Sequence, residues 1–456
     1  MIGASRDETS GHTSYERRLV IVVRADPVIC GHSGEARNLA EVALERGFTD
    51  VKIVTWPLDL LVTSGLPLKP LDGVLPYSTG IEVERPEPVG DYKVPDGRHL
   101  AGITGRLVEL FTDGVPTVCI SLYLSPHTLA VSEALRIARS TGLPVPVLTI
   151  AEAVGSDVTN VVRSCAGDGR FGAAAQVLSA YLNSDLPVAV SEYTKELIIS
   201  SAEEIDVRHG TCFGQRCRQR VAISYPAINT ADYFDITPTQ TDQVLHRRGL
   251  MRDGYVLFLS RLARAKGVDD LITGFTASAA CKELQLVIAG NGPEAQQLRE
   301  FAAQTPAANR ISFLDDVDDD EKPHLMAGCA AFVLPSKPRP EFVETFGIAL
   351  VEKMLAGGGP VITTTTGGIA EAVADTAMIV PVGSPHSIAD ALNVAVTMPS
   401  NQQAAMAERA RAHAVQFDRT HVFDRLLERL TEVTERELSP SDADLSTQLS
   451  YSSTGF

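Results

Sequence analysis

Two carboxylates flank a candidate phosphate-binding backbone in the stretch from Pro340 to Glu352, PEFVETFGIALVE. The stretch follows a predicted strand, 331–334, and a helix begins just after Glu344. Free N–H groups at a helix start bind anions, and the carboxylates of Glu344 and Glu352 can accept hydrogen bonds from hydroxyls. Together they favour a ligand that carries both phosphates and hydroxyls, as a sugar nucleotide does.

A second candidate ligand loop lies near the N-terminus. The apolar run 19–23 predicts a buried strand, the loop after it contains Gly31 and Gly34, and a helix and another strand, 51–55, follow. This order predicts a parallel, doubly wound sheet. The glycines would let the backbone approach a ligand closely, and a tight turn without a ligand explains them equally well.

The charge balance argues against two classes of partner. The chain of 456 residues has 40 Lys and Arg against 57 Asp and Glu, a net charge of −17. This excess of acid disfavours nucleic acid and anionic lipid surfaces as partners. The length allows two or more domains, each with its own core.

Cysteine usage and hydropathy predict the compartment. Seven cysteines spread from Cys30 to Cys329 do not indicate a disulfide framework. Cys212 and Cys217 form the close pair, and we interpret them as ordinary thiols rather than a zinc site, because no His or Cys partners accompany them. The polar N-terminus lacks a signal peptide's apolar region, and no stretch approaches the ~18 apolar residues of a spanning helix. We expect a soluble, cytoplasmic protein.

Strands and helices alternate in two series along the chain. The segment 226–241 interrupts the alternation with helix breakers and no apolar run, so we take it as the interdomain connection. Residues 57–100 show no clear period, and we expect one or two strands there, such as 81–84, with a long loop.

Four motifs of the second half share one family's order: SRLARAKG (260–267), LVIAGNGPE (286–294), PSKPRPEFVETFGIALVEKMLAGG (335–358) and TTGGIAEAV (365–373). The first half adds CGHSGEARNLAEVALERG, AVSEYTKEL and YPAINTADYF. Over residues 19–436 the chain resembles the retaining GT-B glycosyltransferases of family GT4. Glu344 and Glu352 have that family's E-x7-E spacing.

The resemblance implies an α/β fold of the GT-B type, in which two Rossmann-like, doubly wound domains face each other across a cleft. The expected units are a disordered leader (1–18), an acceptor-binding domain (19–236), a nucleotide-sugar-binding domain (237–419), a helix that crosses back to the first domain (420–436) and a disordered tail (437–456).

The resemblance also implies roles for individual residues. Arg261 and Lys266 would compensate the charge of a departing diphosphate, whereas the alternative for this pair is two solvated loop cations. Glu344, the third predicted catalytic residue, would accept hydrogen bonds from the donor sugar, and Glu352 from the ribose. The rest of the expected donor-binding set is Gly31, Gly34, Gly290, Thr345, Phe346 and Gly347.

The resemblance requires no metal or other cofactor. The acidic run 315–321 contains D-x-D spacings that could suggest a metal site. It lies between a predicted strand and a helix, where Asp satisfies free N–H groups and the positive helix end. We therefore interpret the run as capping.

One family feature is missing. Members carry a histidine just after the strand that 145–150 matches, and here the position falls on Ala151 or Glu152. His127 and His32 are candidate substitutes, with a surface histidine at a helix start as the alternative for His127. The missing histidine supports two hypotheses. The donor sugar lacks an ordinary C6 hydroxyl or is extended there, or the acceptor is as acidic as a thiol and needs little help from a base.

The first half looks most like the mycothiol-type, aminocyclitol and lincosamide antibiotic glycosyltransferases. We therefore expect a small polar acceptor and, in the lincosamide case, S-glycosylation. Two other classes share the fold: nucleotide-sugar 2-epimerases, and catalytically silent partners that bind a sugar nucleotide. The base (GDP, UDP or dTDP) and homo-oligomerisation are left open.

Overall fold

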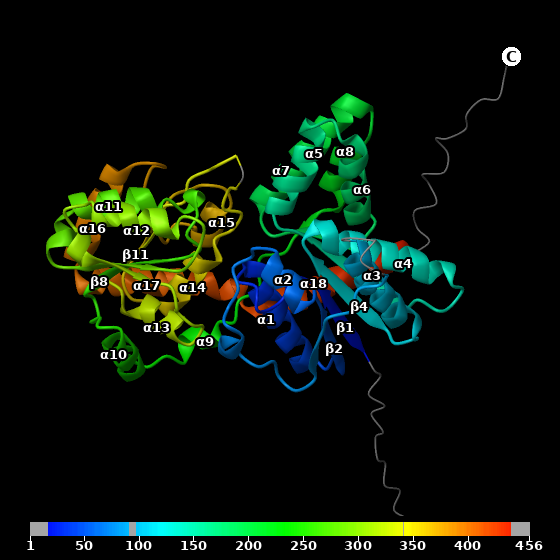
Figure 1. Cartoon of the computed structure of the whole chain (residues 1–456), viewed down its shortest axis with the longest axis horizontal. Coiled ribbons are helices and arrows are strands. Elements are labelled where there is room, and N and C mark those ends of the chain that lie inside the picture. Colours follow the sequence, from blue (N-terminus) through cyan, green and yellow to red (C-terminus); the bar gives the residue numbers. More distant parts are fainter. Residues whose placement is uncertain (1–16, 91–96, 341, 439–456) are drawn as a thin grey trace, which may run out of the picture.

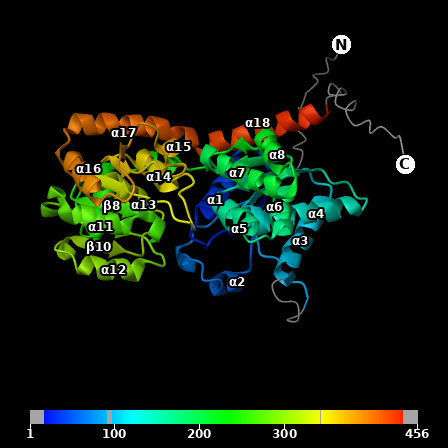
Figure 2. The same cartoon turned by 90° about the horizontal axis from the view of Figure 1, so that it is seen from above.

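The computed structural model describes residues 17–90, 97–340 and 342–438. The expected leader and tail therefore lie outside the described residues, except Arg17, Arg18 and residues 437–438. Figures 1 and 2 show two lobes, each built around a sheet. In the described residues every strand pair of both sheets is parallel. This confirms the predicted α/β class with two Rossmann-like domains.

The first domain has the strand order β3-β2-β1-β4-β5-β6-β7. Its strands are β1 (Arg18–Val22), β2 (Asp50–Val54), β3 (Ile81–Glu84), β4 (Thr117–Leu122), β5 (Val147–Ala153), β6 (Leu186–Ala189) and β7 (Ala222–Ile223). Its helices are α1 (Gly31–Glu45), α2 (Leu58–Thr63), α3 (Gly97–Thr112), α4 (Leu129–Ser140), α5 (Ser164–Gly167), α6 (Phe171–Leu182), α7 (Glu192–His209) and α8 (Phe213–Arg220). β1 is buried along its whole length, as expected of a central strand covered on both faces.

The second domain has the strand order β10-β9-β8-β11-β12-β13. Its strands are β8 (Tyr255–Leu259), β9 (Gln285–Ala289), β10 (Ile311–Leu314), β11 (Ala331–Leu334), β12 (Val361–Thr363) and β13 (Met378–Ile379). The helices from the connection onward are α9 (Ala231–Phe234), α10 (Pro238–Arg247), α11 (Val268–Ala277), α12 (Ala295–Ala303), α13 (Glu321–Gly328), α14 (Ile348–Ala356), α15 (Ile369–Val373), α16 (Pro385–Thr397), α17 (Ser400–Ala414) and α18 (Arg419–Leu438).

Short 3-10 or π turns complete the described chain: η1 (Leu71–Gly73), η2 (Leu124–Thr128), η3 (Val158–Arg163), η4 (Arg264–Lys266), η5 (Ala279–Lys282), η6 (Ala308–Arg310) and η7 (Val415–Phe417).

The last helix, α18, joins the two domains. Figure 2 shows α17 over the second lobe and α18 continuing along the first. Phe423, Leu426 and Leu430 recur at i, i+3 and i+7, and their side chains are buried in the core of the first domain. Arg46 of α1 pairs with Asp424 at 2.7 Å. The helix α18 is therefore part of the first domain's packing.

Two segments contain helices that we did not expect. The 16-residue helix α3 begins inside 57–100, and Ile103, Leu107 and Leu110 bury one face of it. In 226–241, Pro238 does not break a helix but begins α10, and Thr237 forms a capping box with Gln240. The predicted strand 81–84 is confirmed as β3, but the helices in both segments were not expected, because proline at a helix start and the apolar period of α3 were read as loop.

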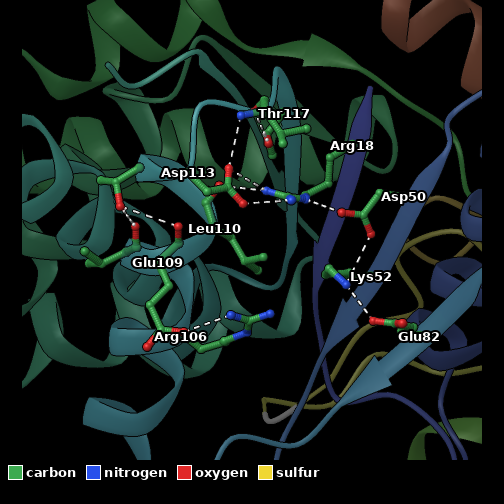
Figure 3. A network of polar contacts seen from close by, with 12 residues as sticks. Arg18, Asp50, Lys52, Glu82, Arg106, Glu109, Leu110, Asp113 and Thr117 are labelled. Atoms are coloured by element: carbon green, nitrogen blue, oxygen red, sulfur yellow. Dashed lines mark hydrogen bonds and ion pairs between the residues drawn. The ribbon is translucent and has the colours of Figure 1, made fainter. Parts of the chain in front are cut away.

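A paired charge network occupies the amino-terminal edge of the first sheet (Figure 3). Arg18, which is 5% exposed, contacts Asp50 at 2.5 Å and Asp113 at 2.8 Å, and Lys52 contacts Glu82 at 2.5 Å. Buried charges need such partners, because an unpaired one is costly. These groups are structural and lie at the edge opposite to the ligand-binding end of a parallel sheet.

Within the described chain, the search for membrane spans found no helix with both the length and the apolar character needed to cross a bilayer.

Candidate functional site

The two domains meet where the carboxyl ends of the first sheet face the start of α14. A Cβ atom at Gly155, just after β5, would lie 2.1 Å from Cγ2 of Thr345. One at Gly31, the first residue of α1, would lie 2.9 Å from Cδ1 of Ile348. At both glycines the backbone lies so close to the second domain that a larger side chain would clash. The candidate ligand loops of the two domains therefore lie next to each other. Gly34 has open space around its Cα, so nothing there requires a glycine.

Lys266 and Glu344 form a buried ion pair in this region. Their side chains are 9% and 10% exposed, and Nζ of Lys266 contacts Oε2 of Glu344. The ring of Phe342 lies beside both predicted cations, 5.3 Å from Nζ of Lys266 and 5.7 Å from Cζ of Arg261. The structure thus brings Arg261, Lys266 and Glu344 together, and Arg261 is the exposed member. A cation held in place at low solvent exposure acts strongly on a nearby anion.

The start of α14 leaves its first N–H groups without a side-chain cap. Gly347 is the N-cap residue with φ 104°, a conformation that only glycine adopts without strain, and it offers no side-chain acceptor. Phe346 is 2% exposed and packs against Tyr225 and Phe417, with ring centroids 5.5 and 5.0 Å away. Only the backbone of Phe346 is therefore placed for a ligand, and its ring anchors the site between the domains.

Neighbouring loops hold the Arg261 and Glu344 segments in place. A Cβ atom at Gly290 would lie 2.1 Å from the carbonyl oxygen of Ser260, so the loop after β9 packs directly on the Arg261 loop. The N–H of Gly368 donates to the carbonyl of Glu344 at 2.9 Å. The backbone of the predicted donor site is thus fixed by contacts from two of the sequence motifs.

Glu352 has partners that sequence reasoning did not identify. Lys322 of α13 donates to Oε1 of Glu352 at 2.6 Å, and the hydroxyl of Tyr233 bonds to the same cluster. Burial opposes the charge on Lys322, but Glu352, Tyr233 and Asp319 together outweigh it, so the pKa of Lys322 lies well above its ordinary value. Lys322 therefore sets the orientation of the Glu352 carboxylate. No local pattern marks Lys322, because the pairing spans two helices.

His127 is buried, so the expectation of a surface histidine was wrong. It is 2% exposed, its Nδ1 lies 2.6 Å from the carbonyl of Leu122, and Nε1–H of Trp56 donates to its Nε2 at 3.3 Å. Burial lowers the pKa of His127 to about 3. A neutral ring with both nitrogens engaged by protein groups serves packing.

His32 is the more accessible histidine of this edge. Its ring is edge-on to Tyr123 at 5.9 Å, and burial, with a smaller contribution from Arg24, lowers its pKa to about 4. Near neutral pH it is an uncharged hydrogen-bonding group beside Tyr123.

The position of the missing family histidine contains a carboxyl pair. Ala151 and Glu152 are 1% and 2% exposed, and Glu152 faces Glu35 of α1, which is 3% exposed. Burial raises the pKa of Glu35 to about 8, and burial together with the Glu35 charge raises that of Glu152 well above its ordinary value. The pair therefore retains a proton at neutral pH, which makes Glu152 a poor general base.

This pair should make stability depend on pH. Because the folded pKa of Glu35 is raised from 4.5 to about 8, its protonated state favours folding below pH 4.5, and that contribution is lost as pH rises to about 8. The pKa of Glu152 is also raised, so Glu152→Gln removes one of the two titrating carboxyl groups, and the fall in melting temperature between about pH 5 and pH 8 should be smaller than in the unsubstituted chain. Calorimetric scans across this range test it, with the exposed Glu432→Gln as control. An unchanged slope in Glu152→Gln would refute the shared proton.

Glu371 links the domains by capping a helix of the other lobe. Its carboxylate accepts from the backbone N–H of Glu192 at 2.7 Å and of Tyr193 at 3.0 Å, the first two residues of α7. Ser191 accepts from the N–H of Thr194, so the first three N–H groups of α7 are satisfied. A carboxylate also matches the positive end of the helix dipole.

Glu371→Ala should lower stability by about 1 to 2 kcal/mol, the cost of a lost N-cap. Glu371→Gln keeps one acceptor oxygen and should lose less. Melting temperatures of the two variants check this. Equal melting temperatures for Glu371→Ala and the unsubstituted chain would show that the contact stabilises nothing.

The acidic run 315–321 has protein partners. Asp318 accepts from the N–H of Glu321 at 2.7 Å at the start of α13, Asp316 pairs with Arg248 at 2.9 Å, and Asp319 pairs with Lys69 of the first domain at 2.6 Å. The search of the described residues found no group of three or more His, Cys, Asp or Glu that could hold a metal ion.

The comparisons with known proteins concern the family and the fold. Residues 247–413 match the family model "Glycosyl transferases group 1". The chain is 31% identical over 157 residues to the uncharacterised glycosyltransferase MJ1607 of Methanocaldococcus jannaschii, covering 34% of this chain and 38% of the relative. It is 26% identical over 245 residues to the D-inositol 3-phosphate glycosyltransferase of Mycolicibacterium smegmatis, covering 52% and 53%. The chain thus spans about half or less of these relatives' length.

The fold comparison extends over almost the whole chain. The crystal structure of Anabaena Alr3699/HepE in complex with UDP and glucose superposes with a TM-score of 0.65 at 18% identity, covering 91% of this chain and 99% of that one. The lipopolysaccharide glycosyltransferase WaaG gives a TM-score of 0.60, with 18% identity and 91% and 99% coverage. The chain therefore has the two-domain GT-B fold, and its residues 247–413 match the glycosyl transferases of group 1.

Proposed function

We propose that this chain is a retaining glycosyltransferase that moves a sugar from a nucleoside-diphosphate sugar to a small polar acceptor. The observation that carries the proposal is the buried Lys266–Glu344 pair beside Arg261 and the uncapped start of α14. It combines cations for a diphosphate with a carboxylate for sugar hydroxyls. The match of residues 247–413 to group 1 glycosyl transferases supports it.

In this reaction the bond between the anomeric carbon and the diphosphate oxygen breaks and its electron pair leaves with the diphosphate. The acceptor atom forms its new bond on the same face, and its proton passes to the departing diphosphate oxygen. Negative charge develops on the diphosphate as it leaves. Arg261, Lys266 and the N–H groups at Gly347 are placed to stabilise it without reorganisation. Two protein cations thereby take the part that a metal plays in other phosphate chemistry, so we propose that the enzyme needs no metal.

The acceptor would enter from the first domain, at the edge formed by His32, Tyr123 and the loop after β5. We propose a low-molecular-weight thiol or an aminocyclitol, with S-glycosylation in antibiotic biosynthesis as one outcome. His32 and Glu152 are poor bases near neutral pH, so they offer the acceptor little help in losing its proton. A thiol fits this edge because it releases its proton more readily than an alcohol does.

A turnover panel tests the proposal. The chain is incubated with GDP-, UDP- and dTDP-sugars, each with and without thiol, alcohol and aminocyclitol acceptors, and nucleoside diphosphate and sugar products are measured. Acceptor-dependent release with retained anomeric configuration is expected. Free sugar and isomer without acceptor would instead indicate a 2-epimerase, and binding without any turnover a silent partner subunit.

A further inference from the structure

The switch point of the first sheet carries a cation, Arg24, for which the described part of the chain supplies no ion-pair partner. The strand order reverses between β1 and β4, and ligands of doubly wound sheets bind beside the carboxyl ends of the strands at such a point. Arg24 follows β1 and Tyr123 follows β4, so the two residues flank it. Tyr123 has φ 94°, an uncommon conformation for a residue with a side chain. The chain holds this ring beside the switch point at a conformational cost.

Arg24 is half-buried and stacks its guanidinium on Tyr123, with Cζ 5.2 Å from the ring centroid. Among the described residues, no carboxylate forms an ion pair with it. This contrasts with Arg18 at the opposite edge, which has two carboxylate partners. A stacked ring orients a guanidinium but does not compensate its charge.

The carboxylates of the surrounding loops are occupied by other groups. Asp26 pairs with Arg37 at 2.7 Å, and Asp157 accepts four backbone N–H groups. Glu35 and Glu152 face each other and retain a proton. The nearby rings of His32 and His127 are neutral at pH 7. The guanidinium of Arg24 is therefore the charge that a ligand would meet.

The ring that orients this cation lies next to the donor half of the site. The hydroxyl of Tyr123 bonds to Ser156, and the adjacent Gly155 contacts Thr345, the residue after Glu344. A ligand group held by Arg24 would thus sit on the acceptor side of the interface between the domains.

We propose that Arg24, oriented by Tyr123, binds an anionic group of the acceptor, a carboxylate or a phosphate. This rests on the proposed function and narrows it. An Arg24 site favours an acceptor that carries a carboxylate or a phosphate, such as a thiol with a carboxylate group. It disfavours a cationic aminocyclitol, because Arg24 would repel the ammonium groups.

The first test does not depend on sugar transfer. Inorganic phosphate and acetate are titrated calorimetrically into Lys266→Ala, which lacks the buried donor-side cation, and into Lys266→Ala/Arg24→Met. Weakening of phosphate or acetate binding by at least about tenfold in Lys266→Ala/Arg24→Met supports the proposal. The anion that binds more tightly shows whether the site prefers a phosphate or a carboxylate. The matched control is Lys266→Ala/Arg139→Met, which removes an exposed arginine of α4. Equal binding in all three variants overturns the proposal.

The second test uses turnover with matched acceptors. 3-Mercaptopropionate, its amide and cysteamine differ in charge at one end, and inositol phosphate against inositol gives the phosphate arm. The anionic member of each set should have the highest kcat/KM, Arg24→Met should remove the preference, and Arg24→Lys should retain part of it. A preference for cysteamine, or an unchanged order in a folded Arg24→Met, would refute the anionic acceptor. If no pair turns over, the proposed function fails while the anion titration still decides the role of Arg24.

Discussion

Lys266→Ala should lower kcat by at least about 10²- to 10³-fold, the loss typical of removing one preorganised donor from a developing anion. The Lys266 side chain is 9% exposed, and its Nζ lies against Glu344, beside Arg261 and the ring of Phe342. A solvent-exposed cation could be replaced by water or salt, whereas this one acts where water is largely excluded. Turnover at saturating donor and acceptor measures the effect.

The matched control is Lys282→Ala, which removes an exposed lysine of the same domain and should leave kcat unchanged. Because Lys266→Ala leaves Glu344 buried without its cation, its melting temperature is measured beside its turnover, which separates a folding defect from lost catalysis. If Lys266→Ala retained most of its activity, Lys266 would have no part in the mechanism.

Glu344→Gln should have the next largest effect, a fall in kcat/KM of about 10- to 100-fold. The amide keeps the side chain's shape but removes the charge that accepts from sugar hydroxyls, and hydrogen bonds to charged groups contribute about 1.5–3 kcal/mol each. The amide also holds Lys266 less firmly, since it replaces an ion pair. Steady-state kinetics with the best donor of the panel measures the loss.

A matched control lies close by in sequence. Glu352→Gln changes the carboxylate that Lys322 holds at 2.6 Å, so it should weaken donor binding and raise KM more than it lowers kcat. A Glu344→Gln variant with kcat/KM within about twofold of the unsubstituted chain would contradict a role for this carboxylate at the donor sugar.

The layout of the donor half was predictable because its signals are local. Arg261 and Lys266 lie on one loop, and Glu344 and the start of α14 belong to another. Parallel topology places such loops at the same edge of the sheet. The double winding of both domains followed from the alternation of strands and helices, and the two sheets confirm it.

What the sequence did not reveal depends on contacts between distant segments. Lys322 meets Glu352 across two helices, and Glu35 meets Glu152 from α1 to β5, pairings that no spacing encodes. The burial of His127 depends on Trp56, which follows β2. The helix α3 is a different case: its apolar residues recur at helical spacing, so this signal was present in the sequence and was missed.

Calorimetric titration of the full chain with UDP, GDP and dTDP is the most direct test of the donor site, and it requires neither the sugar nor the acceptor. The account predicts that at least one nucleoside diphosphate binds and that Lys266→Ala weakens this binding by about tenfold or more, through loss of a charge-assisted contact to the diphosphate. Failure of all three nucleotides to bind the unsubstituted chain, or equal affinity in Lys266→Ala, would contradict the account.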